Sequence, residues 1–303
     1  MNAIETHALS KRFAGGFGVH ELDLAVPAGA IYGFLGPNGA GKTTTIRLLL
    51  SLLQPSGGTI AIFGEALTTR RRGALAHVGA LVESPSLYGH LTGRENLEVT
   101  RRLVGVAERR VGEVLAVVEL AGDADRLVRT YSLGMRQRLA LALALLAEPR
   151  ILILDEPTNG LDPAGIQELR ALLRRLTAER GITVFLSSHL LAEIELIATH
   201  LGVLDRGRLL FQGTLDELRR CAPPRLVIEC DDPARALCEL AAAGEAVTPD
   251  GDGTLVVALR SRTSAQINRL LVEGGVEVAR LTLDDASLES LFLALTRAEA
   301  PRA

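Results

Sequence analysis

The chain has 303 residues, 48% of them hydrophobic and 23% charged, and its net charge is −3 at neutral pH. These values predict a folded protein with substantial hydrophobic cores and room for two domains. Because only 3% of the residues are aromatic and tryptophan is absent, nucleic acid is not expected as a partner. The longest apolar run, Leu139 to Ala147, is too short to span a bilayer, so any membrane role requires a partner protein.

The cysteines and the N-terminus predict a cytosolic protein. Cys221, Cys230 and Cys238 match no zinc-binding spacing, and their odd number argues against a disulfide framework, so we expect reduced thiols. The N-terminus has no signal-peptide pattern.

A glycine-rich motif follows the first predicted strands. Residues 2–35 predict short strands, the last of them buried over residues 30–35, and a helix is expected over residues 44–50. Between them the chain fits G-x-x-x-x-G-K-[ST], the phosphate-binding loop of nucleotide hydrolases. The residues of this stretch are Gly36, Pro37, Asn38, Gly39, Ala40, Gly41, Lys42, Thr43 and Thr44.

Each residue type in this motif suits nucleotide chemistry. The three glycines let backbone N–H groups turn inward and form an anion-binding nest at a helix N-terminus. Lys42 is expected to reach the β- and γ-phosphates, and the Thr43 hydroxyl to ligate Mg²⁺. The alternative is a chance glycine-rich turn. Strand, loop and helix in this order are the context that the motif needs.

The middle of the chain changes character. After strands at residues 59–63 and 77–82, residues 92–148 predict an almost wholly helical insert. Thr92 and Glu95 are spaced as a capping box for a helix over residues 96–105. Within it, Ser132 and Gly134 lie just before a helix and form a second candidate anion site; the alternative is an ordinary N-cap.

An α/β pattern resumes with the apolar strand at residues 150–154, which ends in Asp155 and Glu156. We expect Asp155 at the Mg²⁺ site and Glu156 to polarise the attacking water; the alternative is two solvated carboxylates. A helix at residues 163–180 and a strand at residues 182–186 follow. His189 comes after that strand, where its ring would approach the γ-phosphate, although a lone histidine is more often structural. A helix through residue 197 and strands at 201–205 and 208–212 complete the region.

Residues 222–224 read as a linker to a second domain. In chain order the elements expected there are a strand (226–230), a helix (233–243), two strands (245–248 and 254–259), a helix (264–273), a strand (276–283) and a final helix (287–297). The order β-α-β-β-α-β is the ferredoxin-like arrangement.

Residues 1–220 together resemble the ATP-binding subunit of ATP-binding cassette (ABC) transporters. The resemblance implies a P-loop α/β cassette with a mixed sheet and a helical subdomain at about residues 85–148, followed by a small α+β domain at residues 225–303. The matching motifs in chain order are Walker A (Gly36–Thr44), the Q-loop at Glu83, the signature (Tyr131–Met135), Walker B (Ile151–Glu156), a D-loop containing Asp162, and the switch histidine His189.

Two departures from the family pattern carry information. The signature has Leu133 and Met135 in place of a Gly and a Gln, but keeps Ser132 and Gly134, the family's γ-phosphate contacts. Glu83 stands where Gln is usual. With the following Ser-Pro-x-Leu-Tyr it resembles bacitracin and lantibiotic self-protection exporters. A carboxylate there would face Mg²⁺ and the attacking water and alter metal demand or turnover, unless the replacement is neutral.

The adenine-stacking aromatic has three interpretations. Phe13 matches the family position best, Phe17 is an alternative, and a core phenylalanine is the third.

The resemblance implies an ATPase that binds ATP and Mg²⁺ and acts as a head-to-tail dimer, with each ATP between Lys42 of one copy and Ser132 of the other. The dimer would drive a separate membrane permease from the cytoplasmic face, through the region near residues 83–91, and export a peptide antibiotic or another amphipathic compound. One alternative is a non-transport cassette protein acting on ribosomes or nucleic acid. Such relatives usually carry two cassettes or long coiled coils. Another is a regulatory module without turnover, against which Glu156 and His189 argue.

Overall fold

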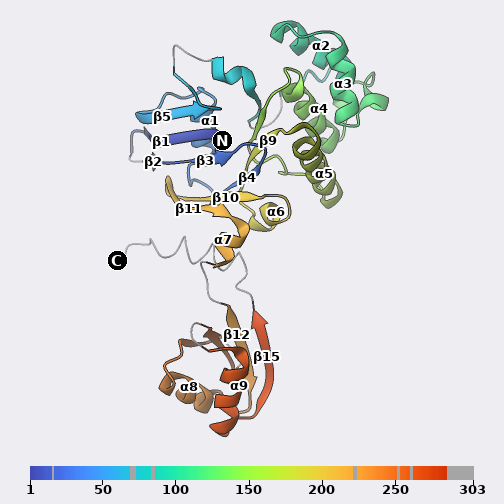
Figure 1. Ribbon diagram of the computed structural model, residues 1–303. Helices are drawn as coiled ribbons and strands as arrows, with labels where there is room; N and C mark the ends of the chain where they lie inside the picture. The colour runs from blue at the N-terminus through green and yellow to red at the C-terminus, as the bar shows by residue number, and fades with distance from the viewer. Residues whose placement is uncertain are drawn as a thin grey trace. The chain divides into compact units, whose positions relative to one another are not determined.

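The computed structural model describes residues 1–15, 17–68, 73–82, 86–220, 224–250, 253–259 and 262–284. The chain separates into two compact units, Met1–Leu215 and Asp216–Ala303. Figure 1 traces the chain through both units.

A six-stranded sheet runs through the first unit. Five of its strands are parallel, and β11 joins one edge in the antiparallel direction. In spatial order the strands are β11 (Arg208–Thr214), β10 (His200–Asp205), β4 (Ile31–Leu35), β9 (Thr183–Ser188), β8 (Ile151–Leu154) and β7 (Val78–Leu81). Every residue of β4, β8 and β9 is buried, which explains their near-continuous apolar sequence.

A second, antiparallel sheet lies beside it. Its strands are β1 (Asn2–Arg12), β2 (Gly18–Leu22), β3 (Ala25–Pro27), β5 (Gly57–Ile62) and β6 (Glu65–Ala66). Side chains from both sheets and from helix α1 (Lys42–Leu49) form one hydrophobic core, in which the Tyr32 and Phe185 rings stack with centroids 5.6 Å apart. The phosphate loop and α1 are therefore anchored between the two sheets.

The helical insert is less continuous than predicted. It consists of α2 (Gly93–Val104), α3 (Arg109–Val117), two short 3₁₀ helices (Ala121–Asp123 and Val128–Thr130) and α4 (Leu133–Leu145). Helices α2, α3 and α4 pack on one another, and α4 packs against β7. The predicted capping box is confirmed, since the Thr92 hydroxyl accepts from Glu95 N and the Glu95 carboxylate accepts from Thr92 N.

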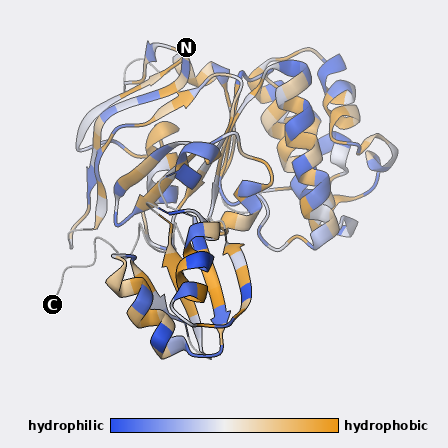
Figure 2. Cartoon of the chain, turned by 60° about the horizontal axis from the view of Figure 1, so that its bottom comes forward, coloured by the Kyte–Doolittle hydropathy of each residue, from blue (hydrophilic) through white to orange (hydrophobic). Residues whose placement is uncertain are grey.

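Three more helices of the first unit are described: α5 (Pro163–Arg180), α6 (Leu191–Glu195) and the 3₁₀ helix η1 (Gly73–His77). Figure 1 shows α2 to α5 grouped on one side of the two sheets. In Figure 2 hydrophilic and hydrophobic residues alternate along these helices, as expected where one helix face is buried.

The second unit has the predicted ferredoxin-like topology. After α7 (Leu215–Arg220), its elements are β12 (Arg225–Cys230), α8 (Pro233–Ala242), β13 (Val247–Pro249), β14 (Thr254–Ala258), α9 (Ser264–Glu273) and β15 (Val278–Asp284). The spatial order is β13-β14-β12-β15, with all neighbours antiparallel. Helices α8 and α9 pack together over a core that includes Leu226, Ile228 and Leu240. The helix predicted at residues 287–297 lies outside the described residues.

No helix in the described ranges has the length and apolar character needed to cross a membrane.

Candidate nucleotide site

The phosphate loop connects the carboxyl end of β4 to the N-terminus of α1. The sequence predicts this helix from residue 44, but it begins at Lys42, because Gly41 adopts a left-handed φ of 109° and acts as the N-cap. At Gly36 a Cβ atom would lie 2.4 Å from the Leu204 carbonyl oxygen of β10, so only glycine fits without a shift of the backbone. Loop and helix therefore have the geometry of an anion-binding nest.

Lys42 lies inside this loop and is 6% exposed. Its Nζ donates to the carbonyl oxygen of Gly36 at 2.7 Å and lies 3.3 Å from the Glu156 Oε1 atom. Thus the lysine of the phosphate loop and the second carboxylate after β8, 114 positions apart, meet in one site.

Glu156 is also bound from the other side. Its Oε2 atom accepts from Asn159 Nδ2 at 2.8 Å and lies 2.7 Å from His189 Nδ1. Because an ionised carboxylate can only accept, His189 carries a proton on Nδ1 and its Nε2 atom remains available to a ligand. The structure brings the predicted site residues Lys42, Glu156 and His189 together.

The pKa of Glu156 lies below its ordinary value. Burial raises it, but the hydrogen bonds from His189 and Asn159 and the positive charge of Lys42 lower it by more. The side chain is thereby kept as a carboxylate, the form that accepts a proton from water.

Asp155 ends the same strand and is 8% exposed. Its Oδ2 atom accepts from the Thr43 hydroxyl at 2.9 Å, and its Oδ1 atom accepts from the Ser187 hydroxyl at 2.6 Å. Strands β8 and β9 pair in register, Leu154 opposite Leu186, so the residues that follow them lie side by side.

The described residues contain no cluster of three or more His, Cys, Asp or Glu side chains that would hold a metal alone. Thr43 and Asp155 nevertheless present two hard oxygen atoms next to the phosphate loop. Mg²⁺ is commonly bound by one or two protein oxygens together with substrate phosphates, and this donor set fits that mode.

The signature residues and the D-loop form a separate site. Ser132, Gly134 and Asp162 line a cavity of about 420 Å³ that includes no residue of the phosphate loop. Ser132 is the N-cap of α4 and accepts from Met135 N at 3.2 Å, while Asp162 is the N-cap of α5 and accepts from Gly165 N at 2.8 Å. Both therefore have a structural role within the chain, in addition to the predicted contact with nucleotide.

The remaining predicted site residues are peripheral or undescribed. Phe13 is 42% exposed and Phe17 is 80% exposed, so neither is a core residue; Lys11 Nζ lies 5.5 Å from the Phe13 ring centroid. Glu83 lies outside the described residues.

Three polar residues at the site were not predicted: Ser187, Asn159 and Gln137. The Nε2 atom of Gln137 donates to the Pro157 carbonyl oxygen at 2.8 Å. The sequence signal for Ser187 was a hydroxyl at the end of an otherwise apolar strand, directly before Ser188 and His189. Its partner depends on which strand lies beside β9, which residue types do not reveal.

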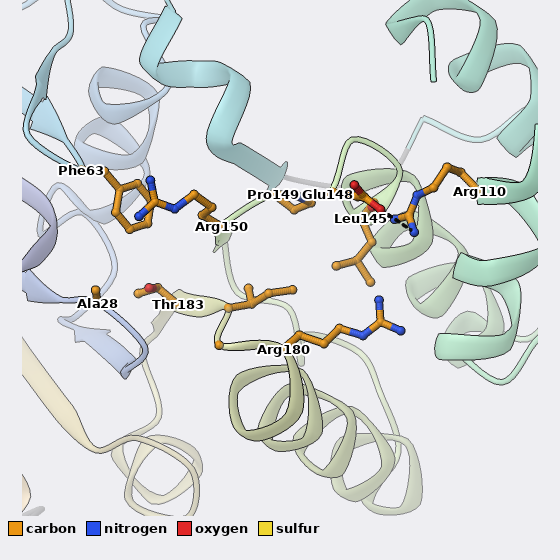
Figure 3. Close-up of a pocket in the computed structure, with 11 residues that line it drawn as sticks. Ala28, Phe63, Arg110, Leu145, Glu148, Pro149, Arg150, Arg180 and Thr183 are labelled. Carbon is orange, nitrogen blue, oxygen red and sulfur yellow. Dashed lines mark hydrogen bonds and ion pairs between the residues drawn. The ribbon is translucent and has the colours of Figure 1, made fainter. Parts of the chain in front are cut away.

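Another cavity, of about 480 Å³, lies at the opposite end of the sheet, where β8 and β9 begin (Figure 3). Arg150 lies over the Phe63 ring on one side of it, with 3.8 Å between guanidinium carbon and ring centroid. Arg110 lies on the other side, next to Glu148. In parallel sheets ligands bind at the carboxyl ends of the strands, so this cavity is remote from the nucleotide site.

Comparison with known proteins agrees with this geometry. The family model for ABC transporters matches residues 19–159. The bacitracin transport ATP-binding protein BcrA of Bacillus licheniformis is 42% identical over 295 residues, covering 96% of each chain. The daunorubicin/doxorubicin resistance ATP-binding protein DrrA of Streptomyces peucetius is 39% identical, over 97% of this chain and 92% of that protein. The lantibiotic transport ATP-binding protein SrtF of Streptococcus pyogenes is 38% identical over 65% of this chain and 85% of its own.

Solved structures give the same result for the first unit. The chain of CbiO1 from Clostridium perfringens, part of an ABC transporter complex, superposes with a TM-score of 0.66 at 26% identity, over 73% of this chain and 94% of that one. An ATP-binding subunit of an ABC transporter superposes with a TM-score of 0.64 at 31% identity, over 72% and 92%. The chain thus combines the phosphate loop, Glu156 and His189 in one site with this similarity, and it belongs to the ATP-binding, ATP-hydrolysing proteins of the ABC transporter family, in the group that includes the bacitracin and lantibiotic transport proteins.

Proposed function

We propose that this ATPase powers export of a peptide antibiotic or another amphipathic compound through a separate membrane permease, at the inner face of the cell membrane. The similarity to BcrA and DrrA supports this substrate class, because it extends over nearly the whole of each chain. The observation that carries the hydrolytic part is the Glu156 carboxylate, held between Lys42 and His189 at the end of β8.

Each residue of the site has a distinct task in this proposal. The phosphate loop and Lys42 bind the β- and γ-phosphates, and Thr43 and Asp155 supply the protein oxygens for Mg²⁺. Mg²⁺ bound with the nucleotide neutralises charge on the phosphates. Glu156 orients and polarises the attacking water, and His189 holds the Glu156 carboxylate through Nδ1 while its Nε2 faces the γ-phosphate.

The test of this assignment is Glu156→Gln. Glutamine keeps the size and can still hydrogen-bond, but it cannot accept a proton from water, so ATP binding should persist while hydrolysis falls by about 100-fold or more. Lys42→Ala is the contrasting variant, which should weaken nucleotide binding itself. Equal turnover by Glu156→Gln and the native protein would exclude Glu156 as the base.

We further propose that two copies form the working ATPase, with Ser132 and Gly134 of one copy completing the site around Lys42 of the other. The separation of the signature cavity from the phosphate loop within one chain supports this arrangement. A Lys42→Ala protomer mixed with a Ser132→Arg protomer can form one intact site and one doubly broken site. Activity should therefore return on mixing two inactive proteins. No recovery in mixed dimers isolated with two different tags would contradict shared sites.

Glu83 keeps its proposed role beside the metal and the attacking water. Glu83→Gln should therefore change the Mg²⁺ concentration that half-saturates hydrolysis. Identical Mg²⁺ titrations would make the residue a neutral variant.

A further inference from the structure

We infer that Ser187 is a positioning residue that orients the metal-binding carboxylate of Asp155 and the backbone of Glu156 through a single hydroxyl group. The inference rests on the Mg²⁺-dependent hydrolysis proposed above. Ser187 lies next to the end of β9 and has no exposed surface.

The direction of its two hydrogen bonds follows from the partners. The Glu156 backbone N–H lies 2.9 Å from Ser187 Oγ and can only donate. The hydroxyl oxygen therefore accepts this bond, and its single proton points to the Asp155 Oδ1 atom, 2.6 Å away. Neither bond can reverse while Asp155 is ionised.

This arrangement decides which oxygen of Asp155 faces the phosphate loop. With Oδ1 bound by Ser187, Oδ2 is the atom turned toward Thr43, on the side of the phosphate loop. Partners behind a metal ligand fix its orientation in this way, and their removal typically weakens metal binding about 10- to 100-fold.

The same hydroxyl acts on the base. Glu156 has a left-handed φ of 47°, a conformation that non-glycine residues adopt only when their surroundings hold them. The bond from its N–H to Ser187 is such a restraint, and it sets where the Glu156 side chain leaves the strand. Metal ligand and base are thus held by one side chain on the neighbouring strand.

The chain offers a matched control for loss of this hydroxyl. Thr183 lies at the other end of β9, is 1% exposed, and its hydroxyl also accepts a backbone N–H, that of Gly29, at 2.9 Å. Thr183→Val removes a buried hydroxyl from the same strand without touching Asp155 or Glu156. It therefore reports the effect of the lost hydrogen bond on stability alone.

The experiment measures the dissociation constant of a fluorescent, non-hydrolysable ATP analogue with Mg²⁺ and with EDTA, for the native protein and for Ser187→Ala, Ser187→Thr and Thr183→Val. In Ser187→Ala, the dissociation constant measured with EDTA should stay within about twofold of the native value. The gain in affinity on adding Mg²⁺ should fall about 10-fold or more. Ser187→Thr, which keeps the hydroxyl, should restore most of that gain. Thr183→Val should keep it in full.

A second pair of variants, Ser187→Thr and Ser187→Val, separates loss of the hydroxyl from a folding defect. Threonine and valine have nearly the same shape, so Ser187→Thr and Ser187→Val differ mainly in the hydroxyl. A Mg²⁺ response that is equal in this pair, or a native response in Ser187→Ala, would overturn the inference. A native protein whose nucleotide affinity and hydrolysis ignore Mg²⁺ would instead refute the proposed function, and the role of Ser187 with it. Hydrolysis rates at saturating Mg²⁺ supply the matching test for the base: Ser187→Ala should lower kcat as well.

Discussion

Glu156 shows how much of the site is decided by single residues. It combines a strained backbone with three side-chain partners, Lys42, His189 and Asn159, which come from three different segments of the chain. The strain persists because these contacts and the bond to Ser187 together over-determine its position. The site should therefore respond to changes in partners that never touch the nucleotide.

Asn159 provides the residue-scale prediction. Its side chain is one of the groups that lower the pKa of Glu156, so Asn159→Ala should raise that pKa. A carboxylate base works only when ionised, so the acid limb of the hydrolysis profile should move to higher pH. The ratio of the rate at about pH 4.5, near the ordinary pKa of a glutamate, to the rate at about pH 7 should fall relative to native. Superimposable pH profiles from the two proteins would show that Asn159 does not tune Glu156.

The residues that the sequence predicted are those whose role follows from local order. Lys42 and Thr43 belong to one continuous motif, and Asp155 and Glu156 end one apolar strand. Ser187 could not be assigned, because its partners depend on the in-register pairing of β8 with β9. Likewise, residue types do not show that Ser132 and Asp162 line one cavity, since 30 positions separate them.

At the scale of elements, apolar periodicity predicted the strands and the long helices, while the exact helix ends depended on capping residues. Helix α5 begins and ends as predicted, with Asp162 as its N-cap and Gly181 as its C-cap. Helix α2 ends where the capping-box pattern predicted, because Gly105 adopts a left-handed φ of 74° and caps the helix.

The Arg110 side chain on α3 forms hydrogen bonds to the end of α4. It is 7% exposed and donates to the carbonyl oxygens of Leu145 (3.0 Å) and Leu146 (3.3 Å) at the end of α4, where the helix dipole favours a cation. It also pairs with Glu113 and Glu148. Figure 3 shows this side chain reaching the loop after α4. Within the helical insert, α3 is thereby joined to α4, the helix that follows the signature serine.

Loss of the Arg110 hydrogen bonds should destabilise the contact between α3 and α4. Arg110→Met should lower the free energy of unfolding by about 2 kcal/mol, because it leaves the buried carbonyl groups of Leu145 and Leu146 without their donor. Hydrogen exchange should accelerate in α3 and at the end of α4 before it does in β8 or β9. Arg109→Met is the matched control, since Arg109 is 79% exposed and lies 3.9 Å from Glu113, an ion pair worth less than about 1 kcal/mol. Equal losses in the two variants would show that the effect is not specific to the Arg110 hydrogen bonds.

On the scale of the whole molecule, the order of elements predicted the architecture. Alternating strands and helices indicated a mostly parallel sheet in the first unit, and β-α-β-β-α-β indicated the antiparallel ferredoxin-like sheet of the second. The purely antiparallel sheet of β1, β2, β3, β5 and β6 was not predicted as a separate layer. Its strands are short or interrupted by bulges, so their pairing is set by contacts between distant residues.

The role of residues 225–303 is the remaining question at this scale, and we propose that they act as a distinct unit that tethers or regulates the dimer. Their sequence contains no histidine and no phosphate loop, and every proposed nucleotide contact precedes Arg220. The second unit has its own core of Leu226, Ile228, Leu240 and neighbouring residues. A chain that ends after Arg220 should therefore retain ATP binding.

The concentration dependence of hydrolysis distinguishes a tether from a stabilising extension. If the second unit adds dimer contacts, it raises the effective concentration of one cassette for the other, so its removal shifts the protein concentration needed for full specific activity upward. The truncated and full-length proteins should then reach the same maximal rate per molecule, the truncated one only at higher concentration. Curves that coincide at all concentrations would leave the unit as a packing extension only. Loss of nucleotide binding on truncation would instead place part of the cassette beyond Arg220.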